Sequence, residues 1–173
     1  MKKILFYLIF TVISVGFTGC GANHQEVIKI YNNKNIYNTV IYSNGLMPVY
    51  PNAAGGIDVK LSYINLSSKT IKYIYFDVTA YNDVEDITVS TISNKATASL
   101  RVIGPIHNEE VKNGQFSNVW YNSTISGVKL NQIRIEYMDK STHTIEEKDI
   151  SKIFGKTINP IWQNIHTYRK LNR

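Results

Sequence analysis

The sequence contains a single cysteine, Cys20, among its 173 residues. One cysteine cannot form a disulfide bond within its own chain, and it cannot supply the paired thiolates of a zinc site. Motifs of the common enzyme classes are also missing: there is no Gly-x-Ser-x-Gly elbow, no phosphate-binding glycine loop and no His-Glu-x-x-His pair. These absences favour a protein without a catalytic site.

Positive charge is neither abundant nor concentrated. Lysine and arginine number 19 against 13 acidic residues, which gives a formal net charge of +6. The basic residues are scattered along the chain, apart from Arg169, Lys170 and Arg173 near the C-terminus. Nucleic-acid-binding domains gather such residues on one face. The sequence therefore predicts no nucleic-acid partner.

Long hydrophobic runs are missing too, with one exception at the N-terminus. Lys2 and Lys3 precede an almost wholly apolar stretch over residues 4–17, and no charge follows before Cys20. A helix that spans a membrane needs about 20 apolar residues, so this stretch is too short to be a permanent anchor. Its three-part pattern predicts a cleaved secretory signal peptide over residues 1–19.

Cys20 stands directly after this signal. Phe17, Thr18 and Gly19 before it resemble the bacterial lipobox, whose small residues admit the chain to the signal peptidase for lipoproteins. Phe17 departs from the lipobox pattern, which prefers Leu, Val or Ile there. The resemblance implies that Cys20 begins the mature chain and carries a thioether-linked diacylglycerol, which anchors the protein by burying its acyl chains in the membrane. The alternative is an unpaired thiol in an exported protein.

A lipid-anchored exported protein is expected on the outer side of the bacterial cell membrane, or on the outer membrane where the source has two membranes. Composition divides the mature chain into three parts. Residues 20–54 predict a lipidated tether that can donate one edge strand, residues 55–147 predict a β domain, and residues 148–173 predict a helical tail.

Alternation of apolar and polar residues marks the β domain. The first two strands, at 57–63 and 70–82, should bury alternate side chains in the core, namely Ile57, Val59, Leu61, Tyr63, Ile74, Phe76, Val78 and Ala80. Further strands are expected at 87–92, 99–103, 115–121, 130–137 and 142–146. Gly104-Pro105 should end the strand before it, and Asn113-Gly114 should form a tight hairpin turn. Short strands without helical crossovers predict an all-β antiparallel sandwich, with a small barrel as the alternative.

The C-terminal tail follows a different pattern. Asn159 suits a helix N-cap and Pro160 the first helical position, while Ile161, Ile165 and Tyr168 recur at helical spacing. The sequence therefore predicts a short C-terminal helix. We expect its apolar side to pack over an aromatic surface of the β domain.

Five short pieces of the β domain carry a resemblance. They are Lys-Thr-Ile-Lys-Tyr-Ile at 69–74 leading to Phe76, Tyr-Asn at 81–82, Gly-Pro at 104–105, Val-Trp-Tyr-Asn at 119–122 and Ile-Glu-Tyr-Met-Asp at 135–139. In this order they resemble a family of uncharacterised immunoglobulin-like domains in secreted proteins and lipoproteins, mainly of Gram-positive bacteria. The family often has glycine where this chain has Glu85 and Lys140. It has no assigned activity, so the resemblance implies an immunoglobulin-like sandwich of about seven strands and an extracytoplasmic location only.

Four aromatic residues are the best candidates for a ligand or partner surface: Tyr73, Tyr75, Trp120 and Tyr121. Aromatic side chains are enriched in interface cores. A two-sheet core also needs large side chains, and Trp120 in particular is expected to fill it. Because each sheet buries one face, either Tyr73 and Tyr75 or their neighbours Ile74 and Phe76 must point outward.

Metal sites have little support in the sequence. The acidic turn with Asp83, Glu85 and Asp86 is the best candidate for calcium, which prefers several converging oxygen ligands. An exposed turn needs the same polar residues, and this interpretation is favoured. The histidines at 24, 107, 143 and 166 never stand at metal-ligand spacing, so no metal and no cofactor are predicted.

These patterns predict a non-catalytic binding or assembly module of the cell envelope, held to the membrane through Cys20, with an envelope protein or glycan as its partner. One alternative is a hydrolase acting on envelope glycans, which would need paired carboxylates at a cleft. Another is a lipoprotein that captures a small solute or ion. A contiguous exposed aromatic patch would favour the binding module.

Overall fold

The computed structural model describes residues 39–49, 51–154 and 163–164, so the predicted signal peptide and Cys20 lie outside the described residues. Within them the elements are β1 (Ile41–Pro48), β2 (Gly56–Asn65), β3 (Ile71–Tyr81), β4 (Thr97–Ile106), β5 (Val111–Tyr121), β6 (Gly127–Tyr137), β7 (Thr142–Glu146), the 3-10 helix η1 (Glu147–Ile153) and β8 (Gln163–Asn164). None of the helices in this part of the chain has the length and apolarity to cross a membrane.

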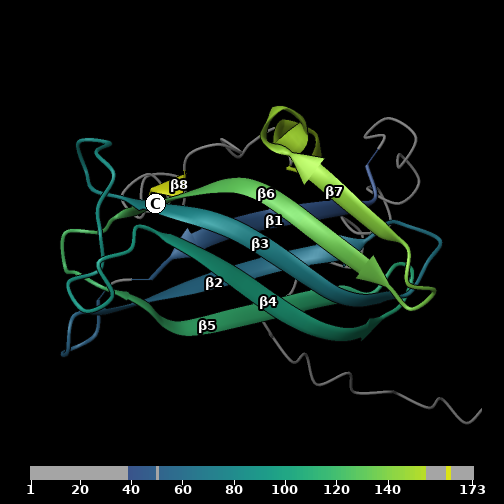
Figure 1. The fold of residues 1–173 in the computed structure, drawn as a ribbon, viewed down its shortest axis with the longest axis horizontal. Coiled ribbons are helices and arrows are strands. Elements are labelled where there is room, and N and C mark those ends of the chain that lie inside the picture. The colour runs from purple at the N-terminus through teal and green to yellow at the C-terminus, as the bar shows by residue number, and fades with distance from the viewer. Residues whose placement is uncertain (1–38, 50, 155–162, 165–173) are drawn as a thin grey trace, which may run out of the picture.

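The strands form two antiparallel sheets that face each other (Figure 1). The three-stranded sheet has the order β1-β2-β5 and the five-stranded sheet the order β4-β3-β6-β7, with the short β8 also paired to β6. The chain thus crosses between the sheets after β2, after β4 and after β5, as chains do in Greek-key sandwiches. The predicted all-β antiparallel sandwich is confirmed, and two separate sheets replace the alternative of a barrel.

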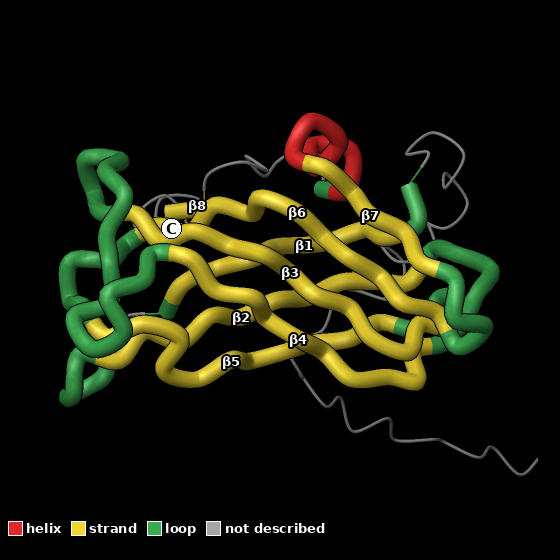
Figure 2. The backbone as a smooth tube through the Cα atoms, viewed as in Figure 1, coloured by secondary structure: helices red, strands yellow, loops and turns green. Residues whose placement is uncertain are grey.

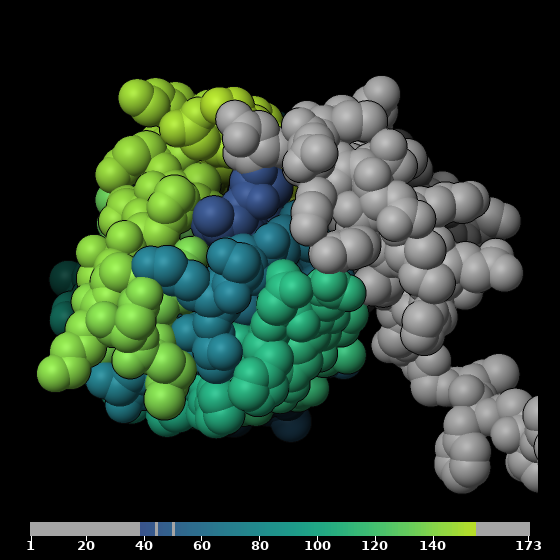
Figure 3. Space-filling model, turned by 90° about the vertical axis from the view of Figure 1, so that its right-hand side faces the viewer, coloured from purple at the N-terminus to yellow at the C-terminus, as the bar shows by residue number. Residues whose placement is uncertain are grey.

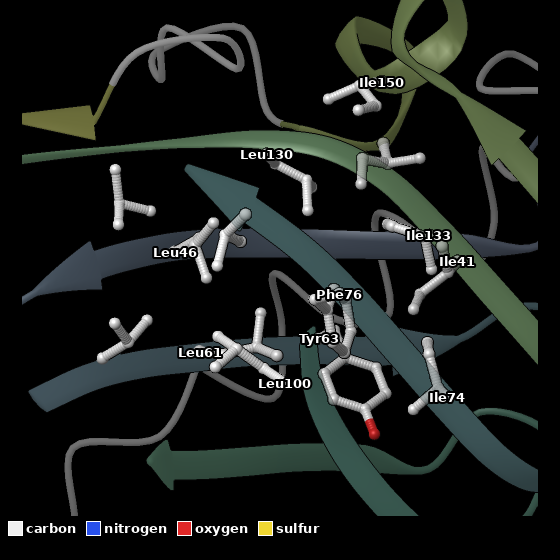
Figure 4. Close-up of a cluster of buried hydrophobic side chains, with 14 of the residues drawn as sticks. Ile41, Leu46, Leu61, Tyr63, Ile74, Phe76, Leu100, Leu130, Ile133 and Ile150 are labelled. Carbon is white, nitrogen blue, oxygen red and sulfur yellow. The ribbon is translucent and has the colours of Figure 1, made fainter. Parts of the chain in front are cut away.

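The core lies between the sheets and follows the predicted alternation (Figure 4). All eight side chains that were expected inside from the first two strands are buried: Ile57, Val59, Leu61, Tyr63, Ile74, Phe76, Val78 and Ala80. Tyr63 from one sheet meets Phe76 from the other, with ring centroids 5.3 Å apart. Such tilted aromatic pairs join the two layers through large buried areas.

One open side of the sandwich is closed by the segment after β7 (Figure 1). The helix η1 buries Ile150 and Ile153, and Phe154 forms a parallel bridge with Ser43 of β1. The predicted tail helix starting at Asn159 and Pro160 falls mostly on positions outside the described residues, including Ile161, Ile165 and Tyr168. Within the predicted tail, residues 148–153 belong to the 3-10 helix η1, which is the short helix at this end of the described chain. Gln163–Asn164 pair with residues 127–128 of β6 as a strand.

Three local predictions between residues 87 and 114 are wrong. Residues 87–92 belong to a loop, in which Ile87 makes only an isolated bridge to Tyr81. Gly104-Pro105 does not end its strand, because β4 continues to Ile106; an edge strand tolerates the missing N–H of proline. Asn113-Gly114 is not a turn but part of β5, with Gly114 opposite Leu61, and the chain reverses at 107–110 instead.

The connections gather at the two ends of the sandwich (Figure 2). Figure 3 looks onto the end where β1 begins, and there the turns near residues 68, 108 and 139 lie side by side. Asn108 Nδ2 donates to Ser67 O at 2.7 Å, and Lys69 forms an ion pair with Asp139 at 2.8 Å. The opposite end carries the long β3–β4 connection.

The β6–β7 hairpin contains a residue in an unfavourable backbone conformation. Lys140 has a φ of 68°, and its N–H donates to Tyr137 O at 3.0 Å. This is the left-handed position of a three-residue hairpin loop, which glycine fills most readily. Glu85, the other residue that replaces a glycine of the resembling family, has a φ of 67°. The turn conformation is therefore kept without the glycine that usually supports it.

Replacing Lys140 by glycine is expected to stabilise the domain by up to about 1 kcal/mol, because glycine avoids the steric cost of a Cβ atom at positive φ. Equilibrium unfolding followed by circular dichroism measures the change. Lys95→Gly is the matched control, since Lys95 is exposed and has no positive φ; it should cost roughly 0.5–1 kcal/mol through unfolded-state entropy. Equal destabilisation by both variants would contradict the backbone argument.

Candidate functional site

Tyr73 and Tyr75 point away from the core on the outer face of the five-stranded sheet. Their neighbours Ile74 and Phe76 are fully buried, so the alternation along β3 places the two tyrosines outside. Both are partly exposed, and their ring centroids lie 6.5 Å apart. The tertiary structure thus selects one of the two arrangements that the sequence left open.

The strand register brings charged side chains from two other strands to this face. Tyr75 lies opposite Arg101 of β4 and opposite Arg134 of β6. Tyr73 lies opposite Ile103 of β4, which is 61% exposed. Residues directly opposite one another in antiparallel strands share a face and interact. We call the outward set Lys72, Tyr73, Tyr75, Asp77, Arg101, Ile103, Arg134 and Glu136 the tyrosine face.

Cations lie over both tyrosine rings. Arg134 Cζ lies 4.9 Å from the ring centroid of Tyr75. Lys72 Nζ lies 4.9 Å, and Arg101 Cζ 5.9 Å, from the ring centroid of Tyr73. Each such contact contributes about 0.5–1 kcal/mol at an exposed site. These contacts favour particular rotamers of the two rings.

Two of the three cations on the tyrosine face are also paired with carboxylates. Arg134 Nε and Nη2 donate to Asp77 at 3.0 and 3.3 Å, and this hydrogen bonding raises the pKa of Arg134. Burial alone would raise the pKa of Asp77, but hydrogen bonds from Arg134 and Ser99 outweigh it and lower that pKa. Lys72 pairs with Glu136 at 2.7 Å.

Arg101 differs from these two cations. Among the described residues it has no carboxylate partner, and its guanidinium is exposed beside Tyr73. Arginine presents five donors in a planar fork that suits carboxylate and phosphate groups. The tyrosine face therefore offers apolar ring area together with one unpaired cation.

Trp120 and Tyr121, the other two candidates for a partner surface, do not belong to the tyrosine face. Trp120 is 1% exposed and belongs to the core, and its Nε1 finds no hydrogen-bond partner among the residues that the structure describes. Tyr121 ends β5 on the three-stranded sheet, where its carbonyl oxygen accepts from Thr91 N at 2.7 Å. The four aromatic residues thus do not form one surface.

The sequence matches no protein-family model and no curated protein. The resemblance to immunoglobulin-like domains of lipoproteins stays a prediction.

The acidic turn considered for calcium is organised by the side-chain amide of Asn82. Asn82 Oδ1 accepts from Val84 N at 3.1 Å and from Asp86 N at 2.9 Å. No group of three His, Cys, Asp or Glu side chains that could hold a metal ion occurs in the described ranges, Asp83 and Glu85 included. The turn therefore offers no assembled metal site.

Five carboxyl groups in the described part of the chain have a pKa below the ordinary value. Their pKa is lowered because hydrogen bonds and nearby cations outweigh burial; they are Asp58, Asp77, Glu110, Asp139 and Asp149. A glycan hydrolase needs one carboxylic acid with a raised pKa. None of these five carboxyl groups has that property.

Sequence reasoning missed Arg101 and Arg134. Both alternate with buried neighbours, Leu100 and Ile133 respectively, so the period-two pattern already placed them on outward faces. It did not indicate that β4 and β6 both flank β3. That neighbourhood is a property of the sheet order, which is non-local.

Proposed function

We propose that this protein is an extracytoplasmic lipoprotein, anchored through Cys20, whose sandwich is a non-catalytic binding module of the cell envelope. The observation that carries the proposal is the tyrosine face. Two partly exposed tyrosines, each under a cation, stand beside an unpaired Arg101 and an exposed Ile103. Tyrosine and arginine are the residue types that dominate the energetics of binding interfaces.

Rigidity supports the same proposal. The tyrosines stand on the central strand β3, which is hydrogen-bonded on both sides, and the cations limit their rotamers. A surface ordered in advance loses little side-chain entropy when a partner binds. Exposed aromatic and apolar area on this face fits recognition of an envelope protein or glycan.

Site-specific photo-crosslinking of the full-length protein in its own cells tests the proposal. A benzophenone amino acid replaces Tyr75 in one variant and Lys60 in a control, because Lys60 is exposed on a strand of the other sheet. We expect a discrete adduct from position 75 and none from position 60. Adding Arg101→Glu should reduce the adduct from position 75 about tenfold or more, since loss of a charged contact costs several kcal/mol.

Two results would overturn the tyrosine-face proposal. One is equal labelling from positions 75 and 60, which would indicate random collisions. The other is an adduct from position 75 that survives Arg101→Glu unchanged, because the unpaired cation would then have no part in recognition. Circular dichroism of each purified variant shows that the sandwich is retained.

A further inference from the structure

Exposed apolar side chains concentrate in the connection between β3 and β4, residues 82–96, which we call the apical loop. Val84 is 74% exposed, Ile87 64%, Val89 41% and Ile92 72%. They are four of the six large hydrophobic side chains that are exposed in the described part of the chain. Single exposed apolar residues are ordinary on a protein surface, whereas a cluster of them marks an interaction site.

The first half of the apical loop is held by its own hydrogen bonds. Asn82 N donates to Asp86 O at 3.0 Å, and the Asn82 side chain accepts from the backbone of Val84 and Asp86. Thr88 N donates to Ala80 O at 3.0 Å and ties the loop back to β3. Val84 and Ile87 therefore project from an ordered turn.

The second half is fastened to the end of β5. Ser90 is 2% exposed, and its Oγ accepts from Tyr121 N at 3.1 Å. Thr91 N donates to Tyr121 O at 2.7 Å, and Asn122 Nδ2 donates to Val89 O at 2.9 Å. Because the backbone is fixed in this way, the fold itself keeps the apolar side chains in solvent.

The net charge of the apical loop indicates which kind of partner surface it can bind. It carries three acidic residues, Asp83, Glu85 and Asp86, against one basic residue, Lys95, although the whole chain has a net charge of +6. Glu85 and Asp86 are exposed and make no ion pair with another described residue. An anionic lipid surface would repel this loop, whereas a basic protein surface would attract it.

The apical loop also lies at the end of the sandwich opposite the start of β1 (Figure 1, left). The connections β1–β2 and β5–β6 at the same end bring no further charge to it at the described positions 49, 51–55 and 122–126. The loop thus forms an acidic and apolar tip on a rigid base.

We propose that the apical loop docks Val84, Ile87 and Ile92 into an apolar cleft of a partner protein whose rim carries lysine or arginine side chains. Exposed Glu85 and Asp86 pair with that rim. This contact is separate from the tyrosine face, which lies on the outer side of the five-stranded sheet. The protein thereby has two independent recognition surfaces.

Photo-crosslinking with a matched pair of isoleucines tests the docking. In one variant of the full-length protein, studied in its own cells, a benzophenone amino acid replaces Ile87. In the comparison variant it replaces Ile103, which belongs to the tyrosine face; the two side chains are 64% and 61% exposed. We expect a protein adduct from position 87 whose crosslinked peptide combines apolar and basic residues. Combining Glu85→Lys with Asp86→Lys should reduce that adduct at least about tenfold, because like charges then meet across the interface, and should leave the adduct at position 103 unchanged.

A second charge reversal, Glu109→Lys with Glu146→Lys, is the control for net charge and should leave the position-87 adduct intact, because both carboxylates are exposed and neither forms an ion pair with another described residue. If the loop variant fails to fold by circular dichroism, Glu85→Gln with Asp86→Asn replaces it. A lipid adduct, an adduct with a second copy of this chain, no adduct, or an adduct insensitive to loop charge would each overturn the proposal.

Discussion

Replacing Asn65 by alanine is expected to destabilise the domain by about 3–4 kcal/mol, a large effect for one side chain. Asn65 is fully buried at the end of β2. Its Nδ2 donates to the carbonyl oxygens of Lys69, Ile106 and His107 at 2.9, 3.0 and 3.1 Å, and its Oδ1 accepts from Ser67 N at 3.0 Å. Alanine would leave several polar groups unpaired in and around the core, and each costs about 1–3 kcal/mol.

Two further variants separate hydrogen bonding from packing at this position. Asn65→Asp keeps the shape but replaces the donating amide by a carboxylate that faces three carbonyl oxygens, so we expect at least the same loss. Asn131→Ala removes one half-buried hydrogen bond, to Thr79 Oγ1, and should cost about 1 kcal/mol. Chemical unfolding measures all three. If Asn65→Asp had a near-native free energy of unfolding, the shape of the side chain rather than its hydrogen-bond donation would hold the turns at 66–70 and 107–110 together.

Replacing Cys20 by alanine is expected to abolish lipid attachment completely. The chain has no other cysteine, so no second thiol can accept the diacylglycerol. In cells fed radiolabelled palmitate, the wild-type protein should carry label and separate into the detergent phase. Without acyl chains, which contribute about 0.8 kcal/mol per buried methylene, the variant should lose both properties.

Phe17→Leu is the companion variant for lipid attachment. It moves the lipobox toward its preferred residue and should keep, or increase, the amount of labelled mature protein. Label that persists in Cys20→Ala would place the acyl group on another residue and contradict the lipoprotein proposal. Unlabelled wild-type protein would do the same.

Local patterns predicted much of the fold because burial on one face of a sheet imposes alternation on each strand. Ile57 to Tyr63 and Ile74 to Ala80 follow that rule and fill the core. Predictions of turns and strand ends from glycine, proline and asparagine were less dependable. Gly114 became part of a strand because pairing β5 with β2 buries apolar side chains such as Trp120 and Leu61, and this outweighs a local turn preference.

The two proposed binding surfaces, the tyrosine face and the apical loop, depend on contacts between strands that a local sequence pattern does not encode. Tyr73 and Tyr75 were recognisable as candidates, yet the cations over them come from Lys72 beside them and from two other strands, at Arg101 and Arg134. Residues 87–92 of the apical loop are predicted as a strand from the local pattern. Its backbone instead hydrogen-bonds to the ends of β3 and β5, which turns those side chains outward.

The sequence by itself determined the alternation that makes this an all-β sandwich, and it alone carries the signal-peptide pattern and the lone Cys20 on which the anchor proposal depends. These features reside in neighbouring residues, so local sequence is sufficient to express them. Only the tertiary structure decided which strands flank β3 and where the exposed apolar residues gather. Those outcomes follow from packing one sheet on the other, a contact between residues far apart in the chain.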